Sequence, residues 1–185
     1  MQVTDGKYRR RRLVSSPSPK VRPTARRLRE MLFEFLGARI VGSRFLDLCA
    51  GSGAVGIEAL SRGASHATFV DRSARMCNLI EQNLERCGVA TAQAAIVLSD
   101  ATAFLRRATR REETFWDIAF FDPPYALDYA PVLEIFGANQ LLKLRSGVLI
   151  AEHHCENSLT DNIGSLRRWR TIRQGESCLS FYERK

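Results

Sequence analysis

The sequence predicts an α/β fold with a mostly parallel sheet and helices on both faces, and three observations support this. Short apolar runs alternate along the chain with segments of helical periodicity. The first run ends in a glycine turn that leads directly into a helix. Strands that alternate with helices become parallel neighbours through right-handed crossovers. The last two strands are instead joined by a turn at Gly175, so we expect one strand of the sheet to run antiparallel.

Seven strands are expected, each a short apolar or alternating run. They cover residues 45–49, 67–71, 94–98, 117–122, 147–152, 167–173 and 178–183. The expected helices cover residues 24–36, 54–60, 74–87, 101–110 and 128–138. Thr24 and Ser73 are the expected N-caps of the first and third helices, and Gly37 and Gly88 are expected to end them.

Residues 1–21 are predicted to form a basic hairpin or arm ahead of a single domain at residues 22–185, with residues 2–5 and 10–15 paired around Gly6. Residues 1–29 hold ten of the 28 Lys and Arg residues but one of the 20 Asp and Glu residues, so the net charge of +8 is concentrated at this end. Such a block indicates a polyanion partner, most simply nucleic acid. The alternative is a solvated, disordered tail.

Length and composition indicate an ordinary globular domain. A chain of 185 residues with 45% hydrophobic and 26% charged residues is large enough for one core. We find no apolar run of transmembrane length and no secretory signal, so no membrane partner is expected. The five cysteines are an odd number without C-x-x-C spacing, and the three histidines lack metal-ligand spacing. We therefore expect reduced thiols in a cytoplasmic protein, with neither disulfides nor a metal site.

The glycine turn is the first candidate binding site. Gly51, Gly53 and Gly56 fit the pattern G-x-G-x-x-G between a predicted strand and a predicted helix. Glycines permit a tight turn and let a ligand approach bare backbone, and the helix N-terminus adds free N–H groups. The turn therefore predicts a site for a nucleotide-like cofactor. A dinucleotide would use the same glycines, and a turn that binds nothing is the alternative.

Acidic residues gather at the same edge of the predicted sheet. Asp71, Asp100 and Asp122 follow or end three strands, and Asp47 lies near the end of the first. In open α/β sheets, ligands bind beyond the carboxyl ends of the strands. Asp71 follows Gly51 by 20 residues, the spacing at which an acid binds ribose hydroxyls. Taken singly, Asp71 or Asp100 is equally well explained as an acid at a helix N-terminus.

The segment Asp122-Pro123-Pro124-Tyr125 is the most specific motif. Its two prolines stiffen the backbone and lack N–H donors, which leaves the Asp122 carboxylate and the Pro123 carbonyl as acceptors. Tyr125 adds an aromatic face. Acceptors beside a stacking face suit a planar base with an exocyclic amino group. A strand that simply ends in prolines is the alternative.

These residues carry a resemblance to one family. The combination of Asp47-x-x-x-Gly51-x-Gly53 with Asp71, Asp100 and Asp-Pro-Pro-Tyr resembles the S-adenosylmethionine-dependent amino-methyltransferases, and most closely the bacterial methyltransferases of guanine N2 in 16S ribosomal RNA. The resemblance covers nearly the whole chain, including residues 22–24, 29–33, 50–53, 58–64 and 179–182. The sequence departs from the family at Gly175-Glu176-Ser177, where Gly-Asp-Thr is usual, and at residues 10–12, where the hairpin usually has a glycine.

The resemblance implies a Rossmann-like methyltransferase fold, S-adenosylmethionine as cofactor, no metal, and a monomeric enzyme. It implies that Asp47 and Gly51 face the methionine part of the cofactor, that Asp71 binds the ribose, and that Asp100 binds the adenine amino group. The full implied cofactor set is Asp47, Ala50, Gly51, Gly53, Asp71, Arg72, Asp100, Ala101 and Asp122. The implied catalytic set is Asp122, Pro123 and Tyr125, with Tyr125 stacked on the base.

The implied partner is 16S ribosomal RNA, within the small ribosomal subunit or an assembly intermediate of it. The residues expected to bind RNA are Arg9, Arg10, Arg11, Arg12, Arg22, Thr24 and Tyr125. Three other functions use parts of the same pattern. A DNA adenine-N6 methyltransferase also has Asp-Pro-Pro-Tyr, but would need an added domain for sequence readout. A nicotinamide-dependent oxidoreductase would leave Asp47 and Asp-Pro-Pro-Tyr unexplained. The third is a non-catalytic RNA-binding assembly factor.

Overall fold

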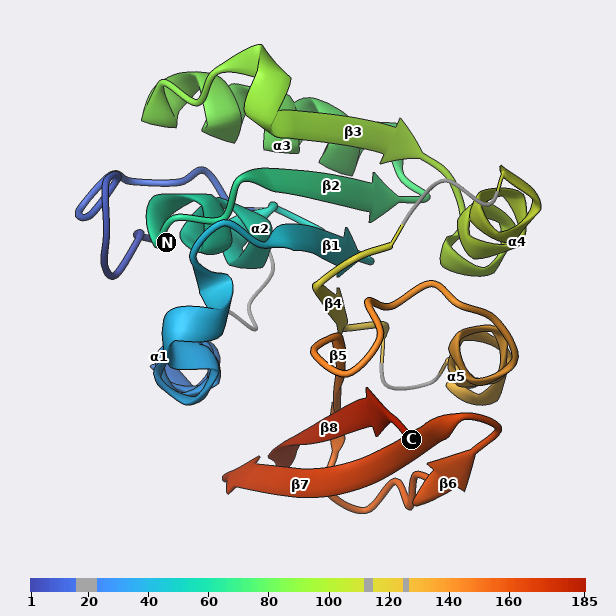
Figure 1. The fold of residues 1–185 in the computed structure, drawn as a ribbon. Helices are drawn as coiled ribbons and strands as arrows, with labels where there is room; N and C mark the ends of the chain where they lie inside the picture. The colour runs from blue at the N-terminus through green and yellow to red at the C-terminus, as the bar shows by residue number, and fades with distance from the viewer. Residues whose placement is uncertain (16–22, 112–114, 125–126) are drawn as a thin grey trace.

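The computed structural model of the chain describes residues 1–15, 23–111, 115–124 and 127–185 (Figure 1). One eight-stranded sheet runs through the molecule in the order β3-β2-β1-β4-β5-β8-β7-β6. The strands are β1 (Arg44–Leu48), β2 (His66–Asp71), β3 (Ala94–Leu98), β4 (Ile118–Phe121), β5 (Val148–His154), β6 (Asn162–Ile163), β7 (Leu166–Gln174) and β8 (Ser177–Arg184). The helices are α1 (Pro23–Leu36), α2 (Ala54–Ser61), α3 (Ala74–Cys87), α4 (Ala101–Arg111) and α5 (Ala130–Ala138), with short 3-10 turns at Gly37–Ile40 and Thr91–Gln93.

The sheet confirms the predicted α/β class. Strands β1 to β5 pair in parallel, and β8 pairs antiparallel with both β5 and β7. The expectation of seven strands missed β6, which pairs antiparallel with β7 at the sheet edge. A strand of two residues is too short to show any hydrophobic alternation, so its sequence gives no signal.

Local sequence explains most helix ends. The Ser73 side chain accepts a hydrogen bond from the Met76 N–H at the start of α3, and Gly88 ends that helix in the left-handed conformation at φ 71°. Helix α1 ends at Leu36, before Gly37, as predicted. The expectation that Thr24 precedes this helix was wrong, because α1 begins at Pro23. Proline suits a first helical position, since its missing N–H would have no partner there.

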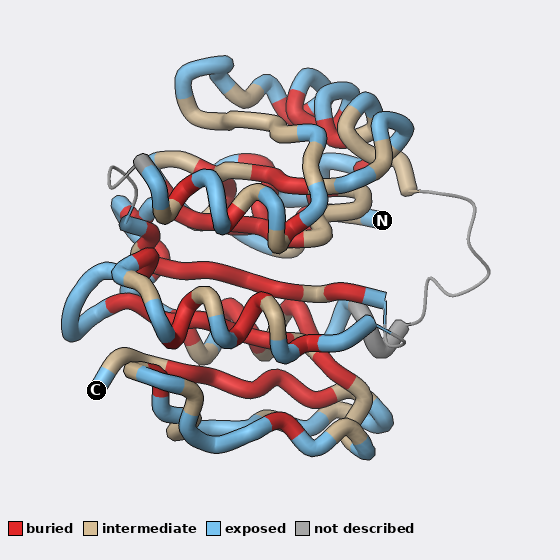
Figure 2. Tube along the Cα trace, turned by 90° about the vertical axis from the view of Figure 1, so that its right-hand side faces the viewer, coloured by how far each residue is buried: buried red, intermediate tan, exposed pale blue. Residues whose placement is uncertain are grey.

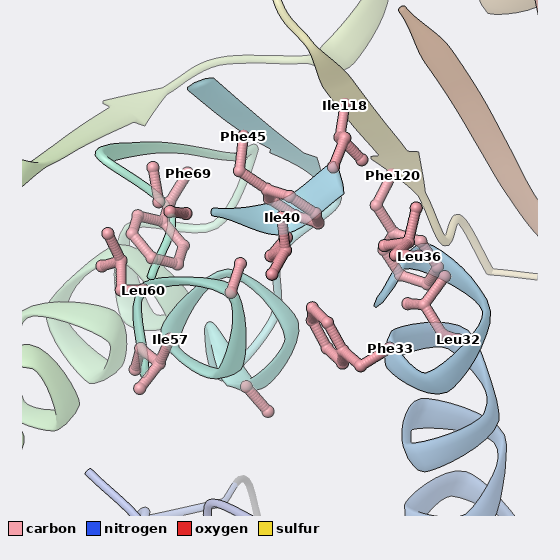
Figure 3. Packing of buried hydrophobic residues seen from close by; sticks show 14 of the residues in the cluster. Leu32, Phe33, Leu36, Ile40, Phe45, Ile57, Leu60, Phe69, Ile118 and Phe120 are labelled. Atoms are coloured by element: carbon pink, nitrogen blue, oxygen red, sulfur yellow. The ribbon is translucent and has the colours of Figure 1, made fainter. Parts of the chain in front are cut away.

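Helices cover both faces of the sheet, as expected. Helices α1, α2 and α3 pack on one face and α4 and α5 on the other, and each face has its own apolar cluster. Figure 2 shows the buried positions concentrated along the strands, with exposed positions on the outer sides of the helices. In Figure 3, Leu36 of α1 lies close to Phe120 of β4. Leu60 of α2 lies close to Phe69 of β2 in the same cluster. Within the described ranges, no helix combines the length and apolar content needed to cross a bilayer.

Residues 1–15 form the expected hairpin, with an antiparallel bridge between Gln2 and Arg12. The hairpin also contributes to the core. Val3, Tyr8 and Leu13 are buried and belong to the same apolar cluster as the α1–α3 face of the sheet. The hairpin is therefore packed onto the domain rather than extended from it.

The buried Glu58 of α2 attaches the hairpin to the domain. Its carboxylate accepts hydrogen bonds from the Thr4 N–H at 2.8 Å, the Thr4 hydroxyl at 2.6 Å and the Asp5 N–H at 3.0 Å. The same carboxylate pairs with Arg62 at 2.9 Å and with the buried Arg29 at 3.7 Å. A buried carboxylate must be neutralised and hydrogen-bonded, and the hairpin supplies part of that environment.

The expectation that all five cysteines are reduced was wrong. Cys155 and Cys178 form a disulfide with 5.1 Å between their Cα atoms, whereas Cys49, Cys77 and Cys87 are free. Strand pairing brings the two together, because β8 returns beside β5 with His153 opposite Cys178. The two cysteines are 23 positions apart in sequence, a spacing that matches no motif, so the pairing depends on tertiary structure.

Candidate active site

The glycine turn follows β1 and leads into α2. Gly51 and Gly53 have φ values of 55° and 74°, a region that favours glycine. A Cβ atom on Gly56 would approach the Phe69 ring to 2.3 Å, and one on Gly53 would approach Ile80 to 3.2 Å, so these two glycines serve packing. A Cβ on Gly51 would meet no atom within 4 Å. Among the three, Gly51 is thus the one that leaves open space for a ligand.

Asp47 of β1 is buried below this turn. Its carboxylate accepts the Gly56 N–H at 2.8 Å, and so satisfies a donor in the first turn of α2. Burial raises the pKa of Asp47 well above its ordinary value; the Gly56 hydrogen bond opposes this, and the nearby Asp122 and Asp71 add to it. Asp47 therefore both holds the helix in place and adds to an acidic site.

Asp71 is the last residue of β2, and both oxygens of its carboxylate accept hydrogen bonds from the backbone. One carboxylate oxygen accepts the Gly51 N–H at 2.9 Å and the other accepts the Ser73 N–H at 2.9 Å. The acid is partly buried, and the next residue, Arg72, is exposed. The carboxylate is thus fixed beside the glycine turn, where the implied ribose contact would need it.

Asp100 follows β3 and caps the next helix. Its carboxylate accepts the Ala103 N–H at 3.1 Å, in the first turn of α4. Asp100 is exposed, and Ala101 beside it is buried. Capping explains this acid structurally, and its exposed oxygens remain open to a ligand.

Cys49 shows how closely the acids converge. This residue sits between β1 and the glycine turn, with a positive φ of 61° that is unusual for a residue other than glycine. Its pKa is raised to about 12, first by burial and then by four carboxylates. Those carboxylates are Asp71, Asp122, Asp47 and Asp100. The structure thus brings all four predicted acids together at the carboxyl edge of the sheet.

Asp122 and Pro123 lie at the end of β4, next to Cys49 in the sheet register. The last registered pair of β1 and β4 is Leu48 with Phe121, and the Asp122 N–H bonds to the Leu48 carbonyl at 3.3 Å. Burial raises the pKa of Asp122 to about 7. Pro123 is buried. Tyr125 lies outside the described residues.

Glu152 of β5 is a further acid of this site that was not among the predicted residues. Burial and then the charge of Asp122 raise the pKa of its carboxyl to about 9. The two acids come next after the last registered pair of β4 and β5, Phe121 with Ala151. Glu152 ends the predicted fifth strand, so the reasoning that selected Asp71, Asp100 and Asp122 applies to it equally.

The hairpin arginines that were predicted to bind RNA are not gathered around Asp122. Arg9, Arg10, Arg11 and Arg12 are exposed on the hairpin, whose Lys7 N–H bonds to the Ser61 carbonyl at the end of α2. That end of α2 leads to the start of β2, whereas the acids lie at the carboxyl ends (Figure 1). Thr24 lies in the first turn of α1, and Arg22 falls outside the described residues.

The buried Asn83 of α3 links the hairpin to the glycine turn. Its side-chain NH₂ donates to the Ser52 and Val14 carbonyls, both at 2.9 Å, and its oxygen accepts the Val14 N–H at 2.7 Å. The last described residues of the hairpin and the backbone of the glycine turn therefore depend on one side chain.

Comparison with known proteins identifies the family. The sequence model of the family described as "Conserved hypothetical protein 95" matches residues 1–183. The chain is 34% identical to "Putative rRNA methyltransferase YlbH" of Bacillus subtilis over the full length of both. It is 38% identical to "Ribosomal RNA small subunit methyltransferase D" of Escherichia coli over 125 residues, which are 68% of this chain and 60% of that protein.

Solved structures of proteins described as methyltransferases are also similar to this chain. "Putative methyltransferase yhhF from Escherichia coli" superimposes with a TM-score of 0.85 at 30% identity, covering 100% of this chain and 98% of that one. "A putative sam-dependent methyltransferase from Streptococcus mutans" shares the fold at 18% identity with a TM-score of 0.70, covering 88% of this chain and 49% of that one. "SMU.776, a putative methyltransferase complexed with SAH" does so at 18% identity with a TM-score of 0.71, covering 88% of this chain and 50% of that one. The chain thus has the Rossmann-like methyltransferase fold and belongs to the family described as "Conserved hypothetical protein 95".

Proposed function

We propose that the protein transfers a methyl group from S-adenosylmethionine to the exocyclic N2 amino group of a guanine in 16S ribosomal RNA. The observation that supports this best is the position of Asp122 and Pro123. Two acceptors stand at the end of β4, one strand away from the glycine turn, so an amino group and a cofactor would meet at one edge. Holding two reactants in line is worth ~7–11 kcal/mol in principle.

The residues present fit this cofactor. Open space adjoins Gly51, and several carboxylates surround it. When bound, S-adenosylmethionine supplies an electrophilic methyl group on a positively charged sulfur. Carboxylates attract such a cation, whereas they would repel the pyrophosphate of a nicotinamide dinucleotide. The electrostatics of the site therefore favour the sulfonium cofactor over the oxidoreductase alternative.

The cofactor residues follow from the resemblance. Asp71 would hold the ribose hydroxyls, Asp100 the adenine amino group, and Asp47 and Gly51 the methionine part. Ala50, Gly53, Arg72 and Ala101 would complete the binding site. The oxygens of Asp71 each accept one backbone N–H already, and a carboxylate has further acceptor capacity for hydroxyl groups.

The amino group would be held by acceptors. The Asp122 carboxylate and the Pro123 carbonyl would accept its two N–H bonds, and Tyr125 would stack on the base. An exocyclic amino lone pair is delocalised into the ring, and acceptors on both N–H bonds favour the form in which the pair points at the methyl group. Acceptors also stabilise the positive charge that develops on nitrogen.

The rRNA substrate is supported by the relatives. Proteins named as rRNA methyltransferases match the whole chain or two thirds of it. The exposed arginines of the hairpin would contact phosphates, which position an RNA without reading its sequence. We therefore propose that a structured ribonucleoprotein, the small ribosomal subunit or its assembly intermediate, presents the guanine. A cytoplasmic location would follow from that substrate.

The test is methyl incorporation from labelled cofactor into small subunits that lack the modification, into naked 16S RNA and into duplex DNA. We expect the subunits to be the best substrate, with the label on guanine N2. Equal activity on naked RNA would contradict the assembled substrate, and higher activity on DNA would favour the adenine-N6 alternative. RNA binding without incorporation would favour the non-catalytic assembly factor.

Calorimetry tests the cofactor independently of any RNA. We expect S-adenosylmethionine to bind and NAD not to bind. The Asp122→Ala variant should still bind the cofactor, about three- to tenfold more weakly above pH 7 because one negative charge near the sulfonium is lost. It should lose methyl transfer, because the same carboxylate holds the amino group. Turnover within a few-fold of the unsubstituted protein would contradict that role.

A further inference from the structure

Asp122 follows the last residue of β4, and Glu152 lies in β5 at the neighbouring position of the parallel pair. The last registered pair of β4 and β5 is Phe121 with Ala151, so Asp122 and Glu152 follow as the next pair. Adjacent strands lie roughly 4.8 Å apart. Phe120 and Ile150, two residues earlier on each strand, both pack in the cluster on the α1–α3 face. Because side chains alternate along a strand, the two carboxyl groups continue on that face.

The surroundings of the pair are acidic. On the β1 side are Asp47 and Cys49, and electrostatic interactions link Asp122 to both. On the other side, Glu152 is registered with the apolar Leu179 of β8. The Tyr129 hydroxyl, just before α5, donates to the Glu152 backbone carbonyl at 3.1 Å. The charge of Asp122 acts on the Glu152 carboxyl.

Two carboxyl groups at neighbouring, buried positions do not ionise independently. Ionising the second puts two negative charges into one poorly solvated space, so a shared site keeps one proton over a wide pH range. We propose that Glu152 is a positioning residue for methyl transfer: its carboxyl group keeps a proton, hydrogen-bonds to Asp122, and leaves the Asp122 carboxylate to accept the proton that the amino group loses. This inference rests on the proposed function.

The proton balance of the reaction gives the pair its role. The amino lone pair forms the new N–C bond, and the electron pair of the broken bond leaves with the methyl donor. The nitrogen must then lose one proton, which passes to an oxygen of Asp122. An ionised Asp122 beside a neutral Glu152 can take that proton, whereas a doubly protonated pair cannot. A doubly ionised pair would lose the hydrogen bond that orients Asp122.

The pKa values indicate that the pair of Asp122 and Glu152 carries one proton near neutral pH. Asp122 has a pKa of about 7 and Glu152 a pKa of about 9, so the singly protonated pair predominates between these values. Both shifts arise first from burial, and that of Glu152 also from the charge of Asp122. Methyl transfer should therefore rise through about pH 7 and fall above about pH 9.

Carboxyl ¹³C NMR tests the pair without cofactor or RNA. We expect the Glu152 carboxyl of the protein to titrate well above the ordinary range for glutamate. In Asp122→Asn its midpoint should fall, because the neighbouring charge is gone. A Glu152 midpoint in the ordinary range, or one that Asp122→Asn does not move, would overturn the proposal.

Activity profiles provide the second test. Glutamine resembles the protonated glutamate, so Glu152→Gln should retain activity within about threefold near pH 8 and lose the decline at alkaline pH. Glu152→Ala should lower activity about tenfold or more at every pH. Glu156→Gln, at a position with 89% side-chain exposure in the following loop, is the control and should match the unsubstituted protein.

The outcomes separate this inference from the proposed function. If the unsubstituted protein methylates no RNA, the proposed function fails, and the positioning role of Glu152 fails with it. If it methylates RNA and Glu152→Gln has the same pH profile between about pH 6 and pH 10, the proposed function stands and the role of Glu152 is overturned. A merely structural Glu152 would change stability without removing one limb of the profile.

Discussion

The Asp71 carboxylate accepts a hydrogen bond from the Gly51 backbone N–H, with 2.9 Å between the oxygen and the nitrogen. One contact thus joins the acid that ends β2 to the glycine turn that follows β1, across 20 residues of sequence. The second oxygen is held by the Ser73 N–H, so the carboxylate has a fixed orientation. A group fixed before its ligand arrives loses less conformational freedom on binding.

Replacing this acid should weaken cofactor binding. Asp71→Ala removes the acceptors proposed for two ribose hydroxyls, and it also releases the Gly51 N–H. We expect a loss of about 1–3 kcal/mol, or roughly 5- to 150-fold in affinity, by calorimetry with S-adenosylmethionine. Glu81→Ala, an exposed acid of α3, is the control. Unchanged affinity in Asp71→Ala would show that the acid serves only the turn and the helix.

The attachment of the hairpin should be sensitive to one buried charge. Glu58→Gln leaves the buried Arg29 without its ionised partner at 3.7 Å, and places an amide where three donors of Thr4 and Asp5 need acceptors. Breaking a buried ion pair costs about 3–5 kcal/mol, and we expect a loss of that size in urea unfolding. Glu85→Gln, exposed on α3, should have little effect. A similar midpoint for both variants would mean that the Glu58 network adds nothing to stability.

Local signals predicted much of the fold. Strand β3 has the predicted bounds, and α3 begins after Ser73 and ends at Gly88, because capping and left-handed glycine act within a few residues. The buried hairpin residues were not anticipated. Val3, Tyr8 and Leu13 are five residues apart in a mostly polar segment and show no helical or strand periodicity, so their burial depends on the cluster that they join on the α1–α3 face.

The sequence predicted those acids of the candidate site that directly follow a strand. Asp71, Asp100 and Asp122 follow strands, and parallel strands bring their ends to one edge. The interaction of Glu152 with Asp122 needs the sheet order, in which β4 lies beside β5, and no local pattern gives that order. The Cys155–Cys178 pairing likewise needs β8 to return beside β5.

The disulfide should stabilise the closing strands. It links residues 23 apart, and closing a loop of that length removes about 3 kcal/mol of unfolded-state entropy. Reduction, or Cys155→Ser with Cys178→Ser, should therefore lower the thermal midpoint. Thiol titration of the unfolded protein should reveal three free cysteines before reduction and five after it. Five thiols before reduction would show that the bond does not form in solution.

RNA binding should depend on charge in the hairpin. Deleting residues 1–20 would also remove Val3, Tyr8 and Leu13 from the core, so substitution is the cleaner test. Arg9→Ala with Arg12→Ala should weaken RNA binding and lower the slope of log K against log salt by about 0.7–0.9 per lost phosphate contact. Arg106→Ala with Arg107→Ala, on α4, is the matched control. An unchanged slope would remove the hairpin from the RNA interface.

Cofactor affinity should rise with pH across neutrality. Asp122, with its pKa of about 7, is neutral below that pH and negative above it, and the negative form attracts the sulfonium of the cofactor. Glu152 stays neutral until about pH 9, so Asp122 dominates the change between pH 6 and 8. We expect affinity for S-adenosylmethionine to increase roughly three- to tenfold over this range, since one titrating group changes log K by at most about one per pH unit. Asp122→Asn should remove most of the increase. S-adenosylhomocysteine has a neutral sulfur, so its affinity for the unsubstituted protein should increase less between pH 6 and pH 8. Equal pH dependence for the two ligands would mean that Asp122 does not act on the sulfonium.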